Sequence, residues 1–326
     1  MPERRVLVTG AELAPAAMRI LEEIGARGDL MAGKVTAEAL GEQLRVKTHA
    51  ILMRGNPPIG AELMSLAPDL KVIAKHGAGV DSVDLAAATA RGVLVMTAND
   101  ANAPAVAEHT IALILALARD VVTLADRTRG GEWARGTYAG QEVTGRTLGL
   151  VGFGRIGRRV AVIARALGIE VVALSAHPGG VDAALAREVA TVAELLAVSD
   201  IVSLHAPLNA ATRGMINRES IALMKHGALL INTARGAMVD EAALLDALHS
   251  GRIGGAALDT LTEEPPPSDY PLLRAPNLIV TPHIAAMTAG AIVRMGVSAA
   301  TNIAAVLTHA PLDRDAVVNK DLLDPR

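Results

Sequence analysis

Short apolar runs alternate along this chain with segments in which apolar residues recur every three or four positions. In the first third, the runs predict strands at 5–9, 50–53, 70–74 and 93–96, and the periodic segments predict helices at 13–24, 60–67 and 83–91. The same alternation resumes later, with strands at 147–151, 170–174, 201–204, 228–232, 255–258 and 278–281 and helices at 158–167, 192–197, 218–223 and 241–249. Strands that alternate with helices predict parallel sheets covered by helices.

Two further helices are predicted outside this alternation. Residues 103–119 are apolar on nearly every face, with Asn102 as a candidate cap and Pro104 in the first turn. We expect this helix to lie between domains or subunits rather than on one side of a sheet, and residues 104–119 to form a homodimer interface. The last helix, 288–307, follows the second sheet and is expected to return to the first domain, with 316–319 fixing the tail.

Composition and charge exclude several classes of protein. A chain of 326 residues can form two domains, and its single Trp, single Phe and two Tyr exclude an aromatic platform for single-stranded nucleic acid. The net charge of −3 is spread along the chain, which argues against nucleic acid or a membrane surface as a partner. Without cysteine there is no disulfide and no thiolate metal site, and we predict no metal site of any kind.

The start of the chain enters a predicted strand directly, without the pattern of a signal peptide. The longest apolar run, 111–118, falls short of the ~18 residues typical of a membrane span. We therefore expect a cytoplasmic protein.

A glycine-rich turn lies between a predicted strand and a predicted helix. Gly152 allows a tight turn, Gly154 lets the backbone approach a pyrophosphate, and Gly157 lets the helix pack closely on the strand. Such a motif alone is weak evidence, but here it lies inside a βαβ unit. The pattern therefore predicts a dinucleotide-binding site, with the anion at the start of the helix.

Three polar stretches each follow a predicted strand of the second sheet. They contain Arg235, Glu264 and His283, and strand ends at one edge of a parallel sheet converge on one site. An isolated Arg is more often part of a surface ion pair, and a lone His is more often structural. Together, however, an Arg that binds a carboxylate and a His paired with a Glu favour acid–base catalysis on an anionic substrate.

The chain resembles the D-isomer-specific 2-hydroxyacid dehydrogenases over nearly its whole length. The matching motifs are His-Gly-Ala-Gly-Val-Asp81, Ala107-Glu-His109, Gly152-Phe-Gly-Arg-Ile-Gly157, His205-Ala-Pro-Leu208, Asn232-Thr-Ala-Arg-Gly236, Val239-Asp-Glu241 and Pro282-His283. The resemblance implies that Arg235 holds the substrate carboxylate, that His283 donates the proton and that Glu264 orients His283. It identifies Glu264, which directly precedes proline, rather than Glu263, and leaves His76, His109 and His205 as structural or supporting residues.

With this resemblance we predict an α/β protein with two doubly wound parallel-sheet domains, a Rossmann dinucleotide-binding domain inserted into a flavodoxin-like substrate-binding domain. The substrate-binding domain is expected at 1–98 and 288–326, and the NAD(P)-binding domain at 99–287. The expected substrate-binding residues are Arg54, Gly77, Ala78, Gly79 and Arg235. The expected cofactor-binding residues are Gly152, Gly154, Arg155, Ile156, Ser175, Pro207, Thr212, Thr233, Ala234 and Asp259, the last on the nicotinamide side.

The end of the second strand departs from the usual pattern of a dinucleotide fold. Ser175 stands where Asp or Glu usually binds the adenosine ribose. A serine does not repel a 2′-phosphate, and His177 lies close by, but the loop directly after Ser175 contains no Arg. The sequence therefore predicts NADP or NAD as cofactor, with a modest preference for NADP.

The predicted reaction is the reversible NAD(P)H-dependent reduction of a 2-oxo acid to a D-2-hydroxy acid. Glyoxylate, hydroxypyruvate, a phosphorylated acid and bulkier 2-oxo acids share the carboxylate and ketone that these motifs recognise. The formate-acting branch is disfavoured, because it is expected to have Gln at the position of Glu264. A nucleotide-sensing corepressor of the same fold is the alternative from a different class, and a turnover assay separates it.

Overall fold

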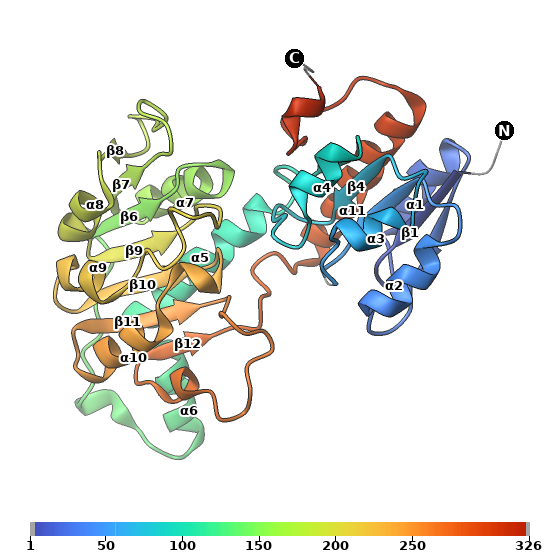
Figure 1. The fold of residues 1–326 in the computed structure, drawn as a ribbon. Coiled ribbons are helices and arrows are strands. Elements are labelled where there is room, and N and C mark those ends of the chain that lie inside the picture. Colours follow the sequence, from blue (N-terminus) through green and yellow to red (C-terminus); the bar gives the residue numbers. More distant parts are fainter. Residues whose placement is uncertain (1–3, 56, 324–326) are drawn as a thin grey trace. The chain divides into compact units, whose positions relative to one another are not determined.

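The computed structural model describes residues 4–55 and 57–323 and divides the chain into two compact units (Figure 1). The first unit combines residues up to Asn102 with residues from Ala286 onward, and the second runs from Ala103 to Ala285. These limits differ by a few residues from the domain limits predicted above. The outermost residues of the predicted first domain, 1–3 and 324–326, lie outside the described residues.

The first unit is built on a five-stranded parallel sheet in the order β2-β1-β3-β4-β5. Its strands are β1 (Arg4–Val8), β2 (Ala26–Leu30), β3 (Ala50–Met53), β4 (Val72–Lys75) and β5 (Leu94–Met96). Its helices are α1 (Pro15–Glu23), α2 (Ala37–Leu44), α3 (Ala61–Ser65), α4 (Leu85–Ala90), α11 (Ala289–Thr308) and the 3₁₀ turn η4 (Lys320–Leu322). This strand order is the flavodoxin-like one, as predicted.

Helices cover both faces of this sheet. On one face, α1 and α11 bury Leu21 and Ile303 against alternate strand residues such as Val6 and Leu52. On the other face, α2, α3 and α4 pack against the intervening positions, for example Ile51. The side chains on the two faces alternate along each strand because successive Cβ atoms point to opposite sides.

The C-terminal part of the chain completes this unit, as the sequence analysis predicted. Val317 forms an antiparallel bridge with Met96, and the Asn319 side chain accepts a hydrogen bond from the Val95 N–H at 2.9 Å. Helix α11 is long and apolar enough to span a membrane by length and composition, but its apolar residues pack on the sheet. The same pattern is typical of a core helix.

Two elements of this unit escaped the sequence prediction. Strand β2 is an edge strand whose only apolar residues are Ala26 and Leu30, and its Arg27 and Asp29 form an ion pair at 2.7 Å. Helix α2 begins at the cap Thr36, whose side chain accepts a hydrogen bond from the Ala39 N–H. A short polar edge strand lacks the apolar run on which the prediction depended.

The second unit is built on a seven-stranded parallel sheet in the order β12-β11-β10-β9-β6-β7-β8, and Figure 1 shows the strands in this order. Its strands are β6 (Thr147–Val151), β7 (Glu170–Leu174), β8 (Arg187–Glu188), β9 (Ile201–Leu204), β10 (Ala228–Asn232), β11 (Ile253–Leu258) and β12 (Leu278–Val280). Its helices are α5 (Ala103–Ala118), α6 (Val121–Arg129), α7 (Arg155–Ala166), α8 (Val192–Val198), α9 (Arg218–Leu223) and α10 (Glu241–His249), with 3₁₀ turns η1 (Ala134–Gly136), η2 (Gly236–Met238) and η3 (Pro271–Arg274). The order reverses between β6 and β9, as in Rossmann folds, and the predicted fold class is confirmed.

The long apolar helix α5 lies on one face of this sheet beside α7. Its Ile114 is fully buried and packs in one cluster with Leu150 and Ile231 of the strands and Val160 of α7. Helices α8, α9 and α10 cover the opposite face. The expectation that α5 would not lie on one side of a sheet is therefore wrong, because α7 and the sheet cover residues such as Ile111, Ile114 and Leu117. A position of α5 at a subunit interface stays a prediction.

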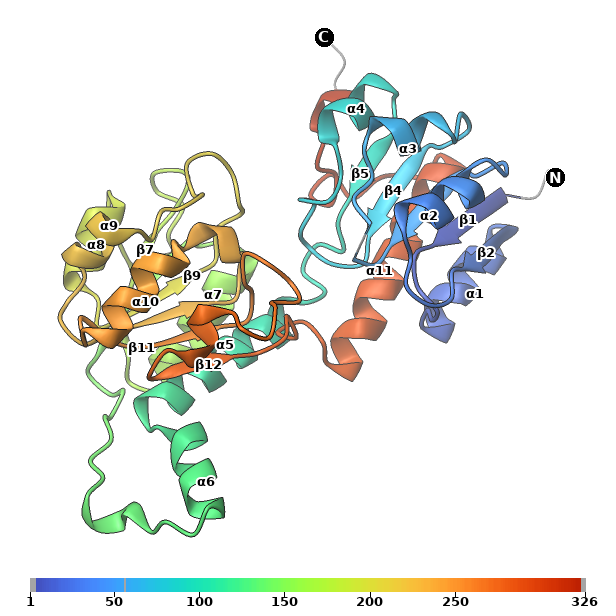
Figure 2. The ribbon, with the colours of Figure 1, turned by 60° about the horizontal axis from the view of Figure 1, so that its bottom comes forward.

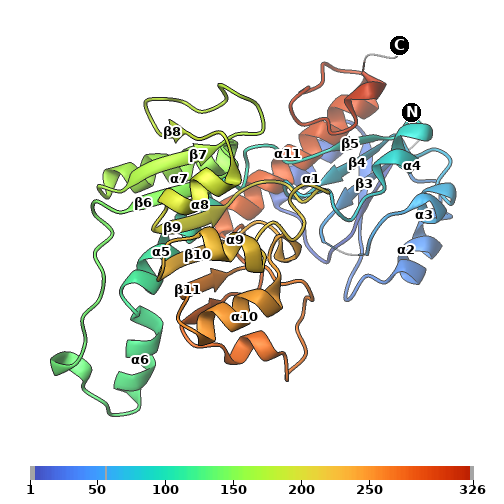
Figure 3. The same ribbon diagram turned by 60° about the vertical axis from the view of Figure 1, so that its left-hand side comes forward.

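Helix α6 stands out from the rest of the second unit (Figures 2 and 3). None of its residues is buried, and it exposes Val121 and Val122 at its start. Trp133, in the segment that follows, is 79% exposed. No element was predicted between residues 119 and 147, so α6 was missed.

Candidate active site

The glycine turn between β6 and α7 shows three different packing situations. A Cβ on Gly152, whose φ is +100°, would lie 2.7 Å from the His205 carbonyl carbon, and a Cβ on Gly157 would lie 2.4 Å from the Gly152 carbonyl oxygen. A Cβ on Gly154, the N-cap of α7, would instead enter open space, and no side chain caps this helix. The turn therefore leaves the first N–H groups of α7 accessible to an anion, as binding of a pyrophosphate requires.

The loop after β7 folds back over Ser175. The Ser175 hydroxyl accepts a hydrogen bond from the His177 N–H at 3.3 Å, and a Cβ on Gly180 would lie 2.2 Å from the same oxygen. Arg158 of α7 donates from Nη2 to the Gly180 carbonyl at 2.8 Å. Nothing in the sequence pattern points to Arg158, since only the folded loop brings it to this position.

The best-defined reactive pair joins the loop after β11 to the loop after β12. His283 donates from Nδ1 to Glu264 Oε2 at 2.7 Å, and Glu264 Oε1 accepts from the Leu261 N–H at 2.9 Å. The two side chains are 52% and 35% exposed, so Nε2 of the imidazole can meet a ligand from solution. The structure thus brings together two of the residues predicted to be catalytic.

The turn that carries His283 is held by a buried carboxylate. His283 has a φ of +55°, and its N–H donates to the Asp259 carbonyl at 2.8 Å. The Asp259 side chain, 1% exposed, accepts from Thr281 Oγ1 at 2.6 Å and from the Ile284 and Ala285 N–H groups at 2.9 Å each. A left-handed conformation at a non-glycine residue is costly and persists only where several bonds enforce it. Asp259 provides these bonds.

The loop after β10 places Arg235 next to the loop of Glu264. A Cβ on Gly236 would lie 2.0 Å from the Leu261 carbonyl carbon, so the two loops are in direct backbone contact. Asn232 fixes the turn, because its side chain donates to the Arg235 carbonyl at 2.8 Å and accepts from the Ala234 N–H at 3.0 Å. Arg235 is partly buried and donates from Nη1 to the Ala234 carbonyl at 2.7 Å.

Glu241 and Tyr270 hold the loop of Glu264 from its other side. Glu241, the first residue of α10, accepts from the Thr262 N–H at 2.8 Å and from the Tyr270 hydroxyl. Desolvation and the Glu241 carboxylate raise the pKa of Tyr270 to about 12, so the phenol remains a donor. The sequence pattern does not predict this contact, because the two residues are 29 positions apart.

Two other predicted cofactor residues, Arg155 and Ile156, begin α7, and the rest lie in loops after β9 and β10. Thr212 donates from its hydroxyl to the Pro207 carbonyl at 2.7 Å, so these two residues share one loop structure. Thr233 shares a hydrogen bond of 3.0 Å with Thr110 of α5. Both loops follow strands of the second sheet, at the edge where such sheets bind ligands.

Arg54 and the glycine loop 77–79 belong to the first unit and follow the neighbouring strands β3 and β4. The Arg54 N–H donates to Thr9 Oγ1 at 2.8 Å, and its guanidinium donates to the Glu12 carbonyl. His76, between them, contacts the Ile292 carbonyl at 3.1 Å. Desolvation, together with the charge of Arg54, lowers the pKa of His76 to about 4.

Two other histidines have supporting positions in the second unit. His205 contacts Ser203 Oγ at 2.9 Å, and desolvation lowers its pKa to about 4, which keeps the ring neutral. His109 of α5 contacts Thr281 Oγ1 at 3.1 Å and so extends the network around Asp259.

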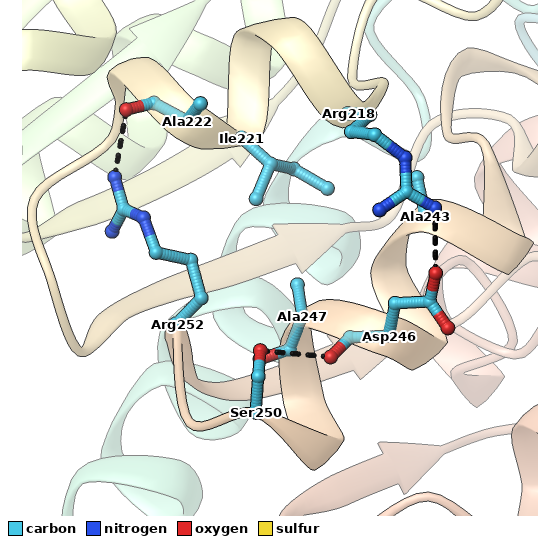
Figure 4. Close-up of a pocket in the computed structure, with 8 residues that line it drawn as sticks. All are labelled: Arg218, Ile221, Ala222, Ala243, Asp246, Ala247, Ser250 and Arg252. Atoms are coloured by element: carbon cyan, nitrogen blue, oxygen red, sulfur yellow. Dashed lines mark hydrogen bonds and ion pairs between the residues drawn. The ribbon is translucent and has the colours of Figure 1, made fainter.

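A cavity of about 190 Å³ between α9 and α10 contains none of the candidate residues (Figure 4). Ile221 and three alanines make up half of its lining residues, and its Arg218 is paired with Asp246 at 2.6 Å. The cavity has no His in its lining, and Arg218 engages its one carboxylate, Asp246, so it is not the candidate active site. Within the described residues, no cluster of His, Asp and Glu could hold a metal ion.

The sequence is similar to a family of dehydrogenases and to individual dehydrogenases. A model of the NAD-binding domain of D-isomer-specific 2-hydroxyacid dehydrogenases matches residues 111–285. D-3-phosphoglycerate dehydrogenase of Mycobacterium leprae is 39% identical over 82% of this chain and 54% of its own length. The enzyme of that name from Methanocaldococcus jannaschii is 40% identical over 93% of this chain and 57% of its own length. The chain thus spans about half the length of the curated relatives it matches.

Solved structures resemble the chain over almost its full length. A protein from Thermus thermophilus is 39% identical with a TM-score of 0.88, and the match covers 96% of this chain and 99% of that chain. A glyoxylate reductase from Paecilomyes thermophila is 31% identical with a TM-score of 0.86, and the match covers 98% and 99% of the two chains.

Proposed function

The chain belongs to the family of D-isomer-specific 2-hydroxyacid dehydrogenases, and from this premise we propose that it reduces a 2-oxo acid to a D-2-hydroxy acid with NAD(P)H in a reversible reaction. The observation that carries the proposal is the His283–Glu264 pair, 2.7 Å apart and next to the loop of Arg235. The open glycine turn in the same unit suits a dinucleotide.

The reduction needs a hydride and a proton. The bound nicotinamide supplies the hydride. Arg235 binds the substrate carboxylate through paired N–H groups. His283 holds the proton at Nε2, because Nδ1 is bonded to Glu264. Glu264 fixes the orientation of the ring and stabilises its cationic form in the acid state.

In the first unit, the backbone of Gly77, Ala78 and Gly79 is proposed to bind the substrate carboxylate. Arg54 is proposed to bind a distal anionic group of the substrate, and capping of its own loop is the alternative role. Arg54 and the glycine loop follow adjacent strands, and Gly77 has a φ of +152°. Glyoxylate, hydroxypyruvate and phosphorylated 2-oxo acids remain the candidate substrates.

The test is a panel of these 2-oxo acids with NADH and NADPH, followed by nicotinamide absorbance. We expect turnover with at least one acid, and the His283→Ala variant should be slower by about 10²–10⁴-fold, as is typical when a positioned proton donor is lost. Binding of NAD(P)H without turnover of any acid would instead support the corepressor-like alternative. A folded His283→Ala variant with the rate of the unmodified protein would refute the role of His283.

For the cofactor, we propose NADP or NAD with a modest preference for NADP. The support is Ser175, which lacks the negative charge that repels a 2′-phosphate. Ser175→Asp should shift the preference toward NADH. A preference of the unmodified protein for NADH of more than about tenfold in kcat/KM, or ~1.4 kcal/mol, would contradict this proposal.

For assembly, we propose a cytoplasmic homodimer. Since α5 is covered within the chain, the support now comes from the exposed Val121, Val122 and Trp133 in and after α6. Trp133 is the single tryptophan, so its emission should shift to shorter wavelength as the concentration rises and the dimer forms. Light scattering that gives a monomer mass at micromolar concentration would rule out this dimer.

A further inference from the structure

The loop after β7 holds the positive charge of Arg158 close to Ser175, which stands where Asp or Glu usually binds the adenosine ribose. Arg158 donates to the Gly180 carbonyl at 2.8 Å, and Gly180 packs directly against the Ser175 hydroxyl, since an added Cβ would lie 2.2 Å from it. The Gly180 N–H donates back to the His177 carbonyl at 3.0 Å, which closes the loop. The guanidinium of Arg158 is therefore anchored beside the residue that replaces the acid.

A second contact of the Arg158 guanidinium is with an aromatic ring. The central carbon of the Arg158 guanidinium lies 4.9 Å from the centre of the Phe153 ring, and Phe153 is only 5% exposed. A guanidinium stacked on a buried ring keeps its plane, and its N–H donors remain in a fixed fork. Of the five donors of a guanidinium, the bond to Gly180 uses one.

Arg158 also lies at the correct end of α7. It is the fourth residue after the cap Gly154, and its N–H donates to the Gly154 carbonyl at 3.0 Å. The first turn of this helix is the predicted site of the pyrophosphate, and Ser175 marks the predicted site of the adenosine ribose. The positive charge of Arg158 lies one turn into α7 and is bonded to the loop after Ser175. This position suits a phosphate on the adenosine ribose.

One negative charge faces the same loop from β8. Both oxygens of Glu188 accept from the Gly179 N–H at 3.1 Å. Glu188 could serve in place of the missing acid and bind the ribose hydroxyls of NAD, so the two side chains favour opposite cofactors. Arg158 is bonded to Gly180, the residue that covers Ser175, whereas Glu188 is bonded to Gly179, whose added Cβ would meet nothing within 4 Å.

We propose that Arg158, together with the Ser175 hydroxyl, forms the binding site for the 2′-phosphate of NADP. The assignment rests on the proposed nicotinamide cofactor and names the residue that selects its phosphorylated form. Arg158 exchanges its bond with the Gly180 carbonyl for charge-assisted bonds to phosphate oxygens, and Ser175 donates the hydroxyl bond.

The test compares 2′,5′-ADP with 5′-AMP by titration calorimetry on the unmodified protein and on Arg158→Gln. We expect Arg158→Gln to weaken 2′,5′-ADP by about tenfold or more and to change 5′-AMP by less than about twofold, as loss of a charge-assisted bond to the phosphate implies. Arg165→Gln is the matched control, because it removes the same charge from the last turn of α7 and should leave both affinities unchanged. Glu188→Gln should not weaken NADH.

Unchanged binding of 2′,5′-ADP to Arg158→Gln, or equal weakening of both nucleotides, overturns the assignment while the reductase proposal stands. Loss of NADH affinity in Glu188→Gln shows that Glu188 holds the ribose and likewise overturns it. An unmodified protein that binds neither nucleotide refutes the proposed cofactor, and the assignment of Arg158 falls with it. In kinetics, the ratio of kcat/KM for NADPH to that for NADH should fall in Arg158→Gln by the same factor as the affinity for 2′,5′-ADP.

Discussion

Replacing Glu264 by Gln removes one charge from the candidate active site and keeps the shape of the side chain. The carboxylate has two partners, the Leu261 N–H at Oε1 and His283 Nδ1 at Oε2. The amide oxygen of Gln can still accept from Leu261, but its NH₂ group then faces His283. The ring is forced to accept at Nδ1, so the cationic form, which has a proton on both nitrogens, is disfavoured.

The size of the effect follows from the distance and the exposure. Two unit charges about 4 Å apart attract each other by about 1 kcal/mol in water and about 4 kcal/mol at an effective dielectric constant of about 20. With side chains 52% and 35% exposed, the pair lies toward the aqueous end, so we expect a loss of about 1–2 kcal/mol. A loss of this size should lower kcat/KM for reduction by about five- to thirtyfold, most strongly at alkaline pH, where the ring must hold its proton without a counter-charge.

The assay is the pH dependence of kcat/KM for 2-oxo acid reduction. Glu263→Gln is the matched control, because it removes the same charge from the neighbouring residue, whereas His283 is bonded to Glu264. The pH profile of Glu263→Gln should be that of the unmodified protein. A Glu264→Gln enzyme with a lower rate but an unshifted alkaline limb would refute the electrostatic role. Glu264 would then act through its shape alone.

Three other predictions concern the surroundings of the site. Tyr270→Phe removes the bond to Glu241 that holds the Glu264 loop, and it should lower kcat more than it raises KM, measured with the same substrate panel. Because desolvation lowers the pKa of His205 to about 4, the unfolded state binds the extra proton first as pH falls. The contribution of this ring to the free energy of unfolding, at most about 3 kcal/mol, is therefore complete above pH ~6.5 and lost between pH ~6.5 and ~4. In His205→Asn, the melting temperature should fall less over that pH range than in the unmodified protein. Gly154→Ala should weaken NADPH binding without changing the melting temperature, whereas Gly157→Ala, whose Cβ would meet the Gly152 carbonyl, should lower that temperature by several degrees; the reverse pattern would contradict the assigned roles of these glycines.

The sequence predicted most of the elements that form the two sheets, because buried parallel strands are short continuous apolar runs. Strand β7 and helix α10 have the predicted limits, and the carboxyl ends of the strands carry the predicted candidate residues. Polar elements at the periphery were missed. Strand β8 has two exposed residues and α6 buries none, so neither produces an apolar pattern.

Helix α5 shows a limit of a different kind. Its apolar character correctly predicted burial, but the pattern does not specify what covers it. An apolar surface of the same chain and an apolar surface of a second subunit would cover α5 equally well. The sequence alone does not distinguish them.

Contacts in the candidate site could be predicted only where the order of the strands brings two side chains together. His283 and Glu264 meet because β11 and β12 are neighbours, and this follows from the resemblance and the topology. Tyr270 meets Glu241, and Arg158 meets Gly180, through loop conformations that no periodic pattern encodes. Such contacts depend on backbone bonds within the loops, and only the structure reveals them.

The division of the first unit between the two ends of the chain has a consequence during protein synthesis. Residues 103–285 form a contiguous unit and can fold on the ribosome as soon as they emerge. The five-stranded sheet must wait, because α11 and Val317 cover the face that includes Val6 and Leu52, and they are translated after the whole second unit. Until then the nascent chain exposes an apolar sheet face, which makes this half of the molecule the natural client of a chaperone and the half most sensitive to premature termination.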